Sequence, residues 1–138
     1  MAAPEIALWY GLVAALRADA GVAALVGGRI YDEPPQGSTR PFVRFGNLNP
    51  SPVRTDCGTA CLVTFSLEVH SRPIAAGRTE AMLIAAALVQ ALSDNEEAVT
   101  VDGYTLSRLQ WMPGAATGGR DDDGESYLEI RGFEAVVG

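Results

Sequence analysis

The segment from Gly114 to Asp121, GAATGGRD, has the glycine spacing of a phosphate-binding loop, which surrounds phosphate groups with backbone N–H groups. Arg120 stands where such a loop has lysine, and Asp121 stands where it has the hydroxyl that binds magnesium. Together with Asp122 and Asp123, Asp121 would also repel phosphate. The segment therefore indicates a flexible glycine-rich loop rather than a nucleotide site.

The three aspartates from Asp121 to Asp123, followed by Gly124, suggest a calcium loop, in which oxygen ligands precede a turn glycine. If Gly124 is that glycine, the first ligand position falls on Gly119, and the last, which needs a bidentate glutamate, falls on Ile130. The register fails. The pattern favours a solvated acidic loop over a weak cation contact.

Cys57, Cys61 and His70 are the residues with side chains suited to zinc, but a structural zinc site needs about four such ligands. If the two cysteines flank a hairpin tip, a disulfide is geometrically conceivable, although a reducing cytosol favours free thiols. We therefore predict no metal site.

Proton-transfer catalysis has little support, because His70 is the only histidine. The strand pattern puts it with Glu68 on the wetter face of a sheet, whereas the neighbouring Ser71 points to the other face. The chain contains no lysine, which excludes Schiff-base chemistry and the ordinary phosphate-binding lysine. The sequence predicts neither an enzyme nor a cofactor site.

Length and charge limit the remaining functions. The chain has 138 residues, a usual length for one domain. Its net charge of −7 argues against a nucleic-acid binder, which needs a basic surface to displace counterions from phosphates. Its most apolar predicted helix, near residues 81–92, is about half the length that spans a bilayer. We expect one domain over residues 1–138, without a specific nucleic-acid or membrane partner.

The elements that must position these residues follow from apolar periodicity. In order, we predict a helix at residues 4–19 and a helical turn at 22–26, strands at 29–32, 41–47 and 63–70, a helix at about 78–92, and strands at 99–101, 104–112 and 127–137. Residues 49–52 read as an irregular loop and residues 114–126 as a long exposed loop. Asp102-Gly103 predicts a two-residue hairpin turn, and Gly132 a β-bulge.

Some side chains are expected to form the core. Leu8, Leu12 and Leu16 line one face of the first helix, and Met82, Ala85, Val89 and Leu92, widened by Ile84 and Leu88, line the second helix. In the third strand, Val63, Phe65, Leu67 and Val69 alternate with polar residues. The order α-β-β-β-α-β-β-β predicts an α+β fold, in which a single mainly antiparallel (mixed) β-sheet is backed by two α-helices.

The stretch AALVGGRIYDEPPQGSTRPFV, residues 23–43, joins a helix stop, a short strand and a proline-rich elbow. The residues that mark this elbow are Gly28, Arg29, Ile30, Tyr31, Pro35, Pro41 and Phe42. With the amphipathic helix before it and the strand at residues 65–72 after it, this order resembles the small tail-completion, or tail-terminator, proteins of long-tailed phages and gene transfer agents. The resemblance extends over roughly residues 6–133.

The resemblance implies a structural virion protein rather than an enzyme. Proteins of this kind form rings, typically hexameric, that cap the head-proximal end of the tail tube, end its polymerisation and join the tail to the head or neck. The implied partners are other copies of the chain, the tail-tube protein and head or neck connector proteins, with DNA only as passing cargo. The implied location is the host cytoplasm during assembly and then the virion tail.

The loop at residues 114–126 is the candidate contact with a neighbouring subunit or tail protein, because Arg120, Asp121, Asp122 and Asp123 offer charge complementarity at a rim. Two other functions compete with the tail terminator. One is another head–tail joining protein of the neck or connector, and the other is a small ligand-binding or regulatory α+β domain.

Overall fold

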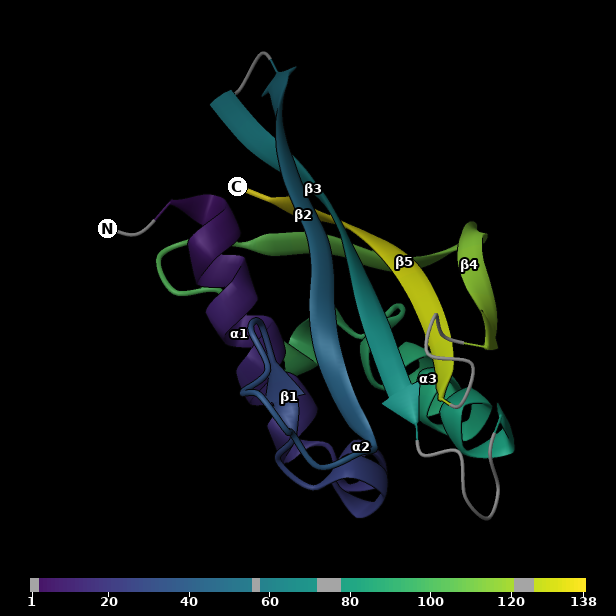
Figure 1. Ribbon diagram of the computed structural model, residues 1–138. Helices are drawn as coiled ribbons and strands as arrows, with labels where there is room; N and C mark the ends of the chain where they lie inside the picture. Colours follow the sequence, from purple (N-terminus) through teal and green to yellow (C-terminus); the bar gives the residue numbers. More distant parts are fainter. Residues whose placement is uncertain (1–2, 56–57, 72–77, 121–125) are drawn as a thin grey trace.

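The computed structural model describes residues 3–55, 58–71, 78–120 and 126–138 (Figure 1). The elements are α1 (Pro4–Ala18), α2 (Ala20–Val26), β1 (Ile30–Tyr31), β2 (Phe42–Thr55), β3 (Gly58–Ser71), α3 (Arg78–Leu92), the 3-10 helix η1 (Glu96–Ala98), β4 (Leu106–Arg120) and β5 (Tyr127–Val137).

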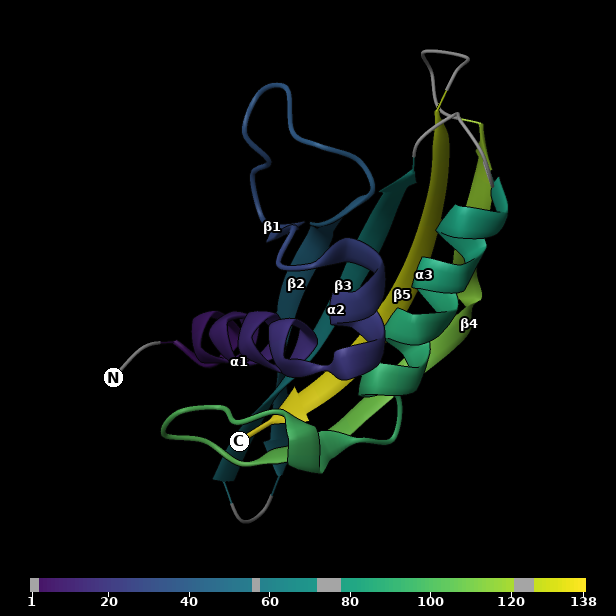
Figure 2. The ribbon, with the colours of Figure 1, turned by 90° about the horizontal axis from the view of Figure 1, so that it is seen from below.

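The strands form one mixed sheet in the order β1-β2-β3-β5-β4. β1 runs parallel to β2, and the other neighbouring strands pair antiparallel. The three α-helices lie on one face of the sheet, with α1 toward the β1–β2 side and α3 toward the β4 side (Figure 2). No helix of the described residues covers the other face. The predicted α+β class and the helix-backed mixed sheet are confirmed.

The two N-terminal helices follow from local sequence signals. Pro4, whose fixed φ suits a first helical turn, begins α1, and Asp19 separates it from α2. The Asp19 carboxylate accepts a hydrogen bond from the Val22 N–H at 3.0 Å, which caps the second helix. Gly27 ends α2 with φ 62°, a conformation that glycine adopts without strain.

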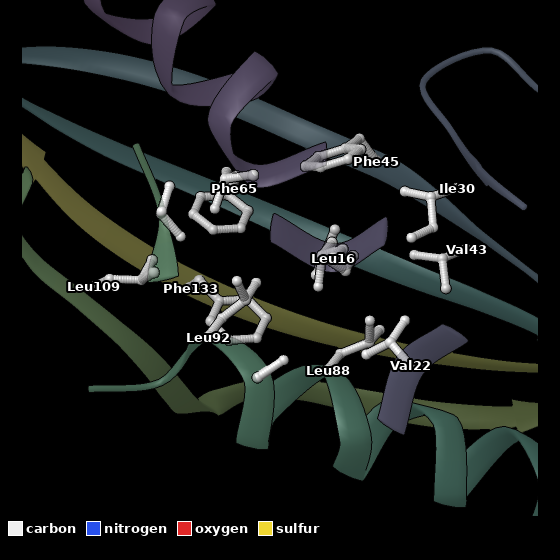
Figure 3. Close-up of a cluster of buried hydrophobic side chains, with 14 of the residues drawn as sticks. Leu16, Val22, Ile30, Val43, Phe45, Phe65, Leu88, Leu92, Leu109 and Phe133 are labelled. Carbon is white, nitrogen blue, oxygen red and sulfur yellow. The ribbon is translucent and has the colours of Figure 1, made fainter. Parts of the chain in front are cut away.

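The core lies between the helices and the sheet (Figure 3). Leu8, Leu12 and Leu16 of α1 are fully buried, as their spacing of four residues predicts. The inward positions of β3 are also buried, and the Phe65 ring stacks on Phe133 of β5 with centroids 5.3 Å apart. Alternation in this strand was therefore a reliable signal.

No single helix in the described part of the chain is long and apolar enough to cross a membrane. Among the described helices, α1 and α2 together reach the required length and composition, but they are bent by 79° where they meet.

α3 buries most of the predicted stripe, but the buried face is rotated away from Met82. Ile84, Ala85, Leu88 and Leu92 are buried, but Met82 is exposed and Val89 is only half-buried. The buried stripe is therefore centred on Ile84 and Leu88, because these residues face β3 and β5 beneath the helix.

The loop predicted at residues 49–52 is wrong, because β2 continues through it to Thr55. Pro50 pairs with Val63 and Pro52 with Cys61. Proline is compatible with an edge strand whose N–H groups point away from the sheet, and beyond Arg44 no described strand pairs with the outer edge of β2.

The strand predicted at residues 99–101 is also wrong. Val99 and Val101 are buried, but they pack against the core without joining the sheet. A turn does form at Asp102-Gly103, where the Tyr104 N–H donates to the Val101 carbonyl at 3.0 Å and Gly103 has φ 83°. The predicted hairpin is wrong, because residues 99–101 are not a strand. The strand after this turn begins at Leu106.

The predicted loop at residues 114–126 is strand for its first seven residues. β4 extends to Arg120, and Thr117 to Arg120 pair with Ile130 to Tyr127 of β5 after an irregularity between Met112 and Thr117. Cross-strand pairing with β5 outweighs the low strand propensity of the glycines. Residues 121–125 lie outside the described residues.

No bulge lies at Gly132, because β5 pairs with β3 in unbroken register from Tyr127 to Val137. The inward positions before Phe133 are occupied by Glu129 and Arg131. The apolar pattern therefore changes at Gly132 because charged residues take the inward positions before it, not because the strand bulges. The register shifts lie in β2 and β4.

Replacing Gly11 with alanine is expected to lower the free energy of unfolding by about 1–3 kcal/mol. An added Cβ would lie 2.2 Å from the Thr100 carbonyl oxygen, so α1 and residues 99–101 would have to separate. This clash outweighs the gain of about 1 kcal/mol in helix propensity. Urea unfolding measures the change. Gly21→Ala in α2 is the matched control, since its Cβ meets only the Asp19 carboxylate, at 3.2 Å; equal stability of the two variants would contradict the prediction.

Candidate assembly surfaces

The elbow is a hydrogen-bonded unit that fixes β1 beside the start of β2. The Arg29 Nε–H donates to the Pro41 carbonyl at 2.8 Å, and the Val43 N–H donates to the Arg29 carbonyl at 2.9 Å. Ile30 is buried and pairs with Val43, while the Ile30 N–H donates to the Gly28 carbonyl at 2.8 Å.

In the link that follows β1, the Pro35 carbonyl accepts a hydrogen bond from the Ser38 N–H at 3.1 Å. These hydrogen bonds hold the elbow together as a local unit of the fold.

Two aromatic residues of the elbow pack beside a cluster of charged side chains on the uncovered face of the sheet. Phe42 stacks on His70 with centroids 4.8 Å apart, and Tyr31 meets Phe42 edge-on at 5.9 Å. The His70 Nε2 lies 3.1 Å from the Glu68 Oε1, which also lies 3.8 Å from an Arg44 nitrogen. His70 shares this face with Glu68, as predicted, but it is packed rather than solvent-exposed.

The arrangement around His70 does not favour hydrolytic chemistry. Ser71 alternates to the opposite, helix-covered face and is fully buried. Cys61 lies on the same strand as His70 but at the far end, about 30 Å away at the usual rise per residue. The two cannot bind one metal ion. Cys57 lies outside the described residues, and within residues 3–55, 58–71, 78–120 and 126–138 no three metal-binding side chains gather.

The uncovered face carries amides and hydroxyls around a shallow hollow of about 350 Å³. The residues that line it include Asn47, Asn49, Thr64, Ser66, Glu68 and Ile130. The Asn47 N–H donates to the Ser66 hydroxyl at 3.0 Å where β2 bulges between Phe45 and Leu48. At the neighbouring edge the Arg108 guanidinium lies 2.6 Å from the Glu134 carboxylate. This face therefore combines polar side chains with apolar ones such as Met112 and Ile130, and its charges at Arg44 and Arg108 lie beside carboxylates.

The outer edge of β4 is partly closed by the segment after α3. The Leu109 N–H donates to the Glu96 carboxylate at 3.0 Å, and the Trp111 N–H donates to the Ser93 hydroxyl at 3.1 Å. The Asp94 N–H in turn donates to the Leu109 carbonyl at 2.8 Å. Capping of these groups prevents another strand from adding at this part of the edge.

An ionic cluster lies beneath α3, where the sequence indicated only apolar packing. The Glu129 carboxylate is almost fully buried, 3.4 Å from the Arg131 guanidinium and 3.8 Å from that of Arg78. It extends over Gly118, where an added Cβ would lie 1.5 Å from its Oε2. The signal that could have revealed the cluster is the alternation of Glu129, Arg131 and Phe133 on one side of a strand.

Of the residues proposed from sequence as the assembly contact, Arg120 lies within the described part of the chain. Arg120 is the last residue of β4, and its backbone pairs with Tyr127. Asp121, Asp122 and Asp123 lie outside the described residues. The contact therefore stays a prediction.

Comparisons with known proteins agree with the fold. The family model described as tail completion protein gp17 matches residues 11–137. Among solved structures, a chain of the "Virion of native gene transfer agent (GTA) particle" has a TM-score of 0.85 and 28% sequence identity over 99% of this chain and 98% of that chain. No curated protein matches. The resemblance expected from the elbow is confirmed, and because the family model covers nearly the whole sheet and its helices, the chain belongs to the tail completion protein gp17 family.

Proposed function

We propose that this structural tail-completion protein forms a ring, typically a hexamer, that caps the head-proximal end of the tail tube. The ring ends tube polymerisation and presents a surface to the head or neck proteins. The observation that carries this proposal is the match of almost the whole chain to a chain of a gene transfer agent virion, together with the tail completion family. Assembly in the host cytoplasm precedes incorporation into the particle.

The protected edges of the sheet support a protein that ends polymerisation rather than one that polymerises itself. Capping closes part of the outer edge of β4, and Pro50 and Pro52 remove hydrogen-bond donors from β2. Open-ended addition of strands from further copies is disfavoured at both edges. Contacts between copies then depend on side chains, which can specify a closed ring.

The negative net charge of the chain supports a role as a structural ring through which DNA passes. The net charge is −7, and the described arginines of the uncovered sheet face, Arg44 and Arg108, lie beside carboxylates. Such a surface has weak affinity for phosphates, so DNA can pass the ring without being held.

Particles made without this chain test the proposal. Electron microscopy should show tails of abnormal length and few heads joined to tails, and expression of the chain from a plasmid should restore both. Tails of normal length that fail to join heads would favour the alternative, another head–tail joining protein. Normal joined particles would contradict any role in tail completion.

Changing Asp121, Asp122 and Asp123 together to asparagine should lower the yield of joined particles while leaving the melting temperature nearly unaltered. We propose that these charges, with Arg120, contact a neighbouring subunit or tail protein. They speed the encounter with that partner and fix its relative position, rather than stabilise the fold. Particle counts and thermal melting measure the two effects. Glu97→Gln, at an exposed position of η1, is the control. A strongly lowered melting temperature would instead give the aspartates a role in the fold.

A further inference from the structure

α1 carries an uncharged stripe on its solvent side. Ile6 and Tyr10 are 47% and 63% exposed, and Ala14 continues the same face one turn later. Single exposed apolar residues are common, but a large aliphatic and an aromatic side chain on successive turns form a continuous patch. We call Ile6, Tyr10 and Ala14 the α1 stripe.

α3 carries a second uncharged stripe. Met82 and Leu83 are 47% and 55% exposed, and Ala86 follows on the next turn. We call these three residues the α3 stripe. It continues into a hollow of about 330 Å³ between α3 and the sheet, lined by Ala86, Val89, Gln90, Trp111 and Arg131. The walls are mainly apolar, which suits a bulky apolar side chain from a partner.

The margins of the two stripes differ in charge. Beside the α1 stripe, a hollow of about 190 Å³ is bordered by Glu5 and Asp32, with Trp9 and Phe45 among the residues that line it. Beside the α3 stripe, the side chain of Arg78 is 57% exposed, one turn before Met82. Glu80 lies in the same helical turn but is less exposed than Arg78, whose guanidinium is 3.8 Å from the buried Glu129 carboxylate. The most exposed charge at this margin is therefore basic, whereas the margin of the α1 stripe is acidic.

The two stripes lie toward opposite sides of the sheet. The hollow beside the α1 stripe includes Phe45 and Leu48 of β2, whereas that beside the α3 stripe includes Trp111 of β4, the strand at the other edge. Figure 2 shows α1 and α3 correspondingly separated across the helix layer. Complementary patches on opposite sides cannot satisfy each other within one chain. They fit a head-to-tail contact, which generates a ring when its rotation closes.

We propose that the α1 stripe of one copy docks against the α3 stripe of the next copy, with Glu5 and Asp32 facing Arg78. This inference rests on the proposed ring and names the surfaces that close it. Apolar contact supplies the attraction, and the charges select the head-to-tail arrangement over pairing of two like stripes, because like stripes would bring equal charges together.

Site-directed crosslinking in assembled particles tests the pairing. Tyr10→Cys and Leu83→Cys are introduced together into a chain that also carries Cys57→Ser and Cys61→Ser, and purified particles are treated with a short bismaleimide. We expect a ladder of covalent multimers on a denaturing gel. Each single cysteine variant should remain monomeric, and a mixture of the two single variants should give dimers only, because each linked pair then lacks a further partner cysteine.

Tyr10→Cys combined with Met112→Cys is the matched control, because Met112 is exposed on the face of the sheet away from the helices. This pair should give no ladder. Self-crosslinking of a single variant would overturn the head-to-tail pairing. Failure of the Tyr10–Leu83 ladder in particles whose tail ends contain the chain would overturn the inference but leave the ring standing. Absence of the chain from purified tails would overturn the proposed function itself.

Discussion

Replacing Phe133 with alanine is expected to lower the free energy of unfolding by about 3–5 kcal/mol, the usual range for a buried phenylalanine. Phe133 is among the largest fully buried side chains, and its ring stacks on Phe65 between the sheet and the helices. Truncation removes both the buried apolar area and the stacked contact, and the strands on either side of β5 hold the cavity open. Chemical unfolding measures the loss.

Val136→Ala is the control for this change, because Val136 lies on the same strand but alternates to the face that the helices leave uncovered. We expect it to cost much less than Phe133→Ala. Equal losses from the two variants would mean that β5 is stabilised by strand pairing alone. A loss below about 1 kcal/mol for Phe133→Ala would mean that the core collapses into the space.

Local patterns predicted those parts of the fold whose signals lie within a few residues of each other. The spacing of Leu8, Leu12 and Leu16 identified the buried face of α1, because a helix brings every fourth residue to one side. Alternation from Val63 to Val69 likewise identified the inward face of β3. The elbow was recognisable because glycine and proline restrict the backbone locally.

Features that depend on neighbours far away in the sequence were not predictable. Pro50 and Pro52 suggest a loop until β2 is known to be an edge strand, where proline is tolerated. The glycines of residues 114–119 suggest a loop until β5 is known to pair with them. The exposed stripe on α3 was missed for the same reason, because the sequence alone could not show which side of an apolar helix meets the sheet.

The same reasoning explains why Glu129 was overlooked, and it leads to a second large effect. Glu129→Ala is expected to lower the free energy of unfolding by about 3–5 kcal/mol, since it removes one partner of a buried ion pair and leaves the half-buried Arg131 without its carboxylate. Arg78→Ala should cost only about 0–1 kcal/mol, because its side chain is 57% exposed and water screens its contact with Glu129. Urea unfolding of both variants measures the difference, and equal losses would contradict a buried Glu129–Arg131 pair.

Gly118 provides an independent check on the position of the Glu129 carboxylate. In the native chain Gly118→Ala should be destabilising, because the added Cβ would lie 1.5 Å from the Glu129 Oε2 and would displace the carboxylate from Arg131. In the Glu129→Ala background that space is empty, so the same substitution should cost little. The two changes should therefore be non-additive by about 0.5–3 kcal/mol, the range found for residues in direct contact. Additive losses would mean that the carboxylate does not extend over Gly118, and the buried pair with Arg131 would then lose its geometric basis.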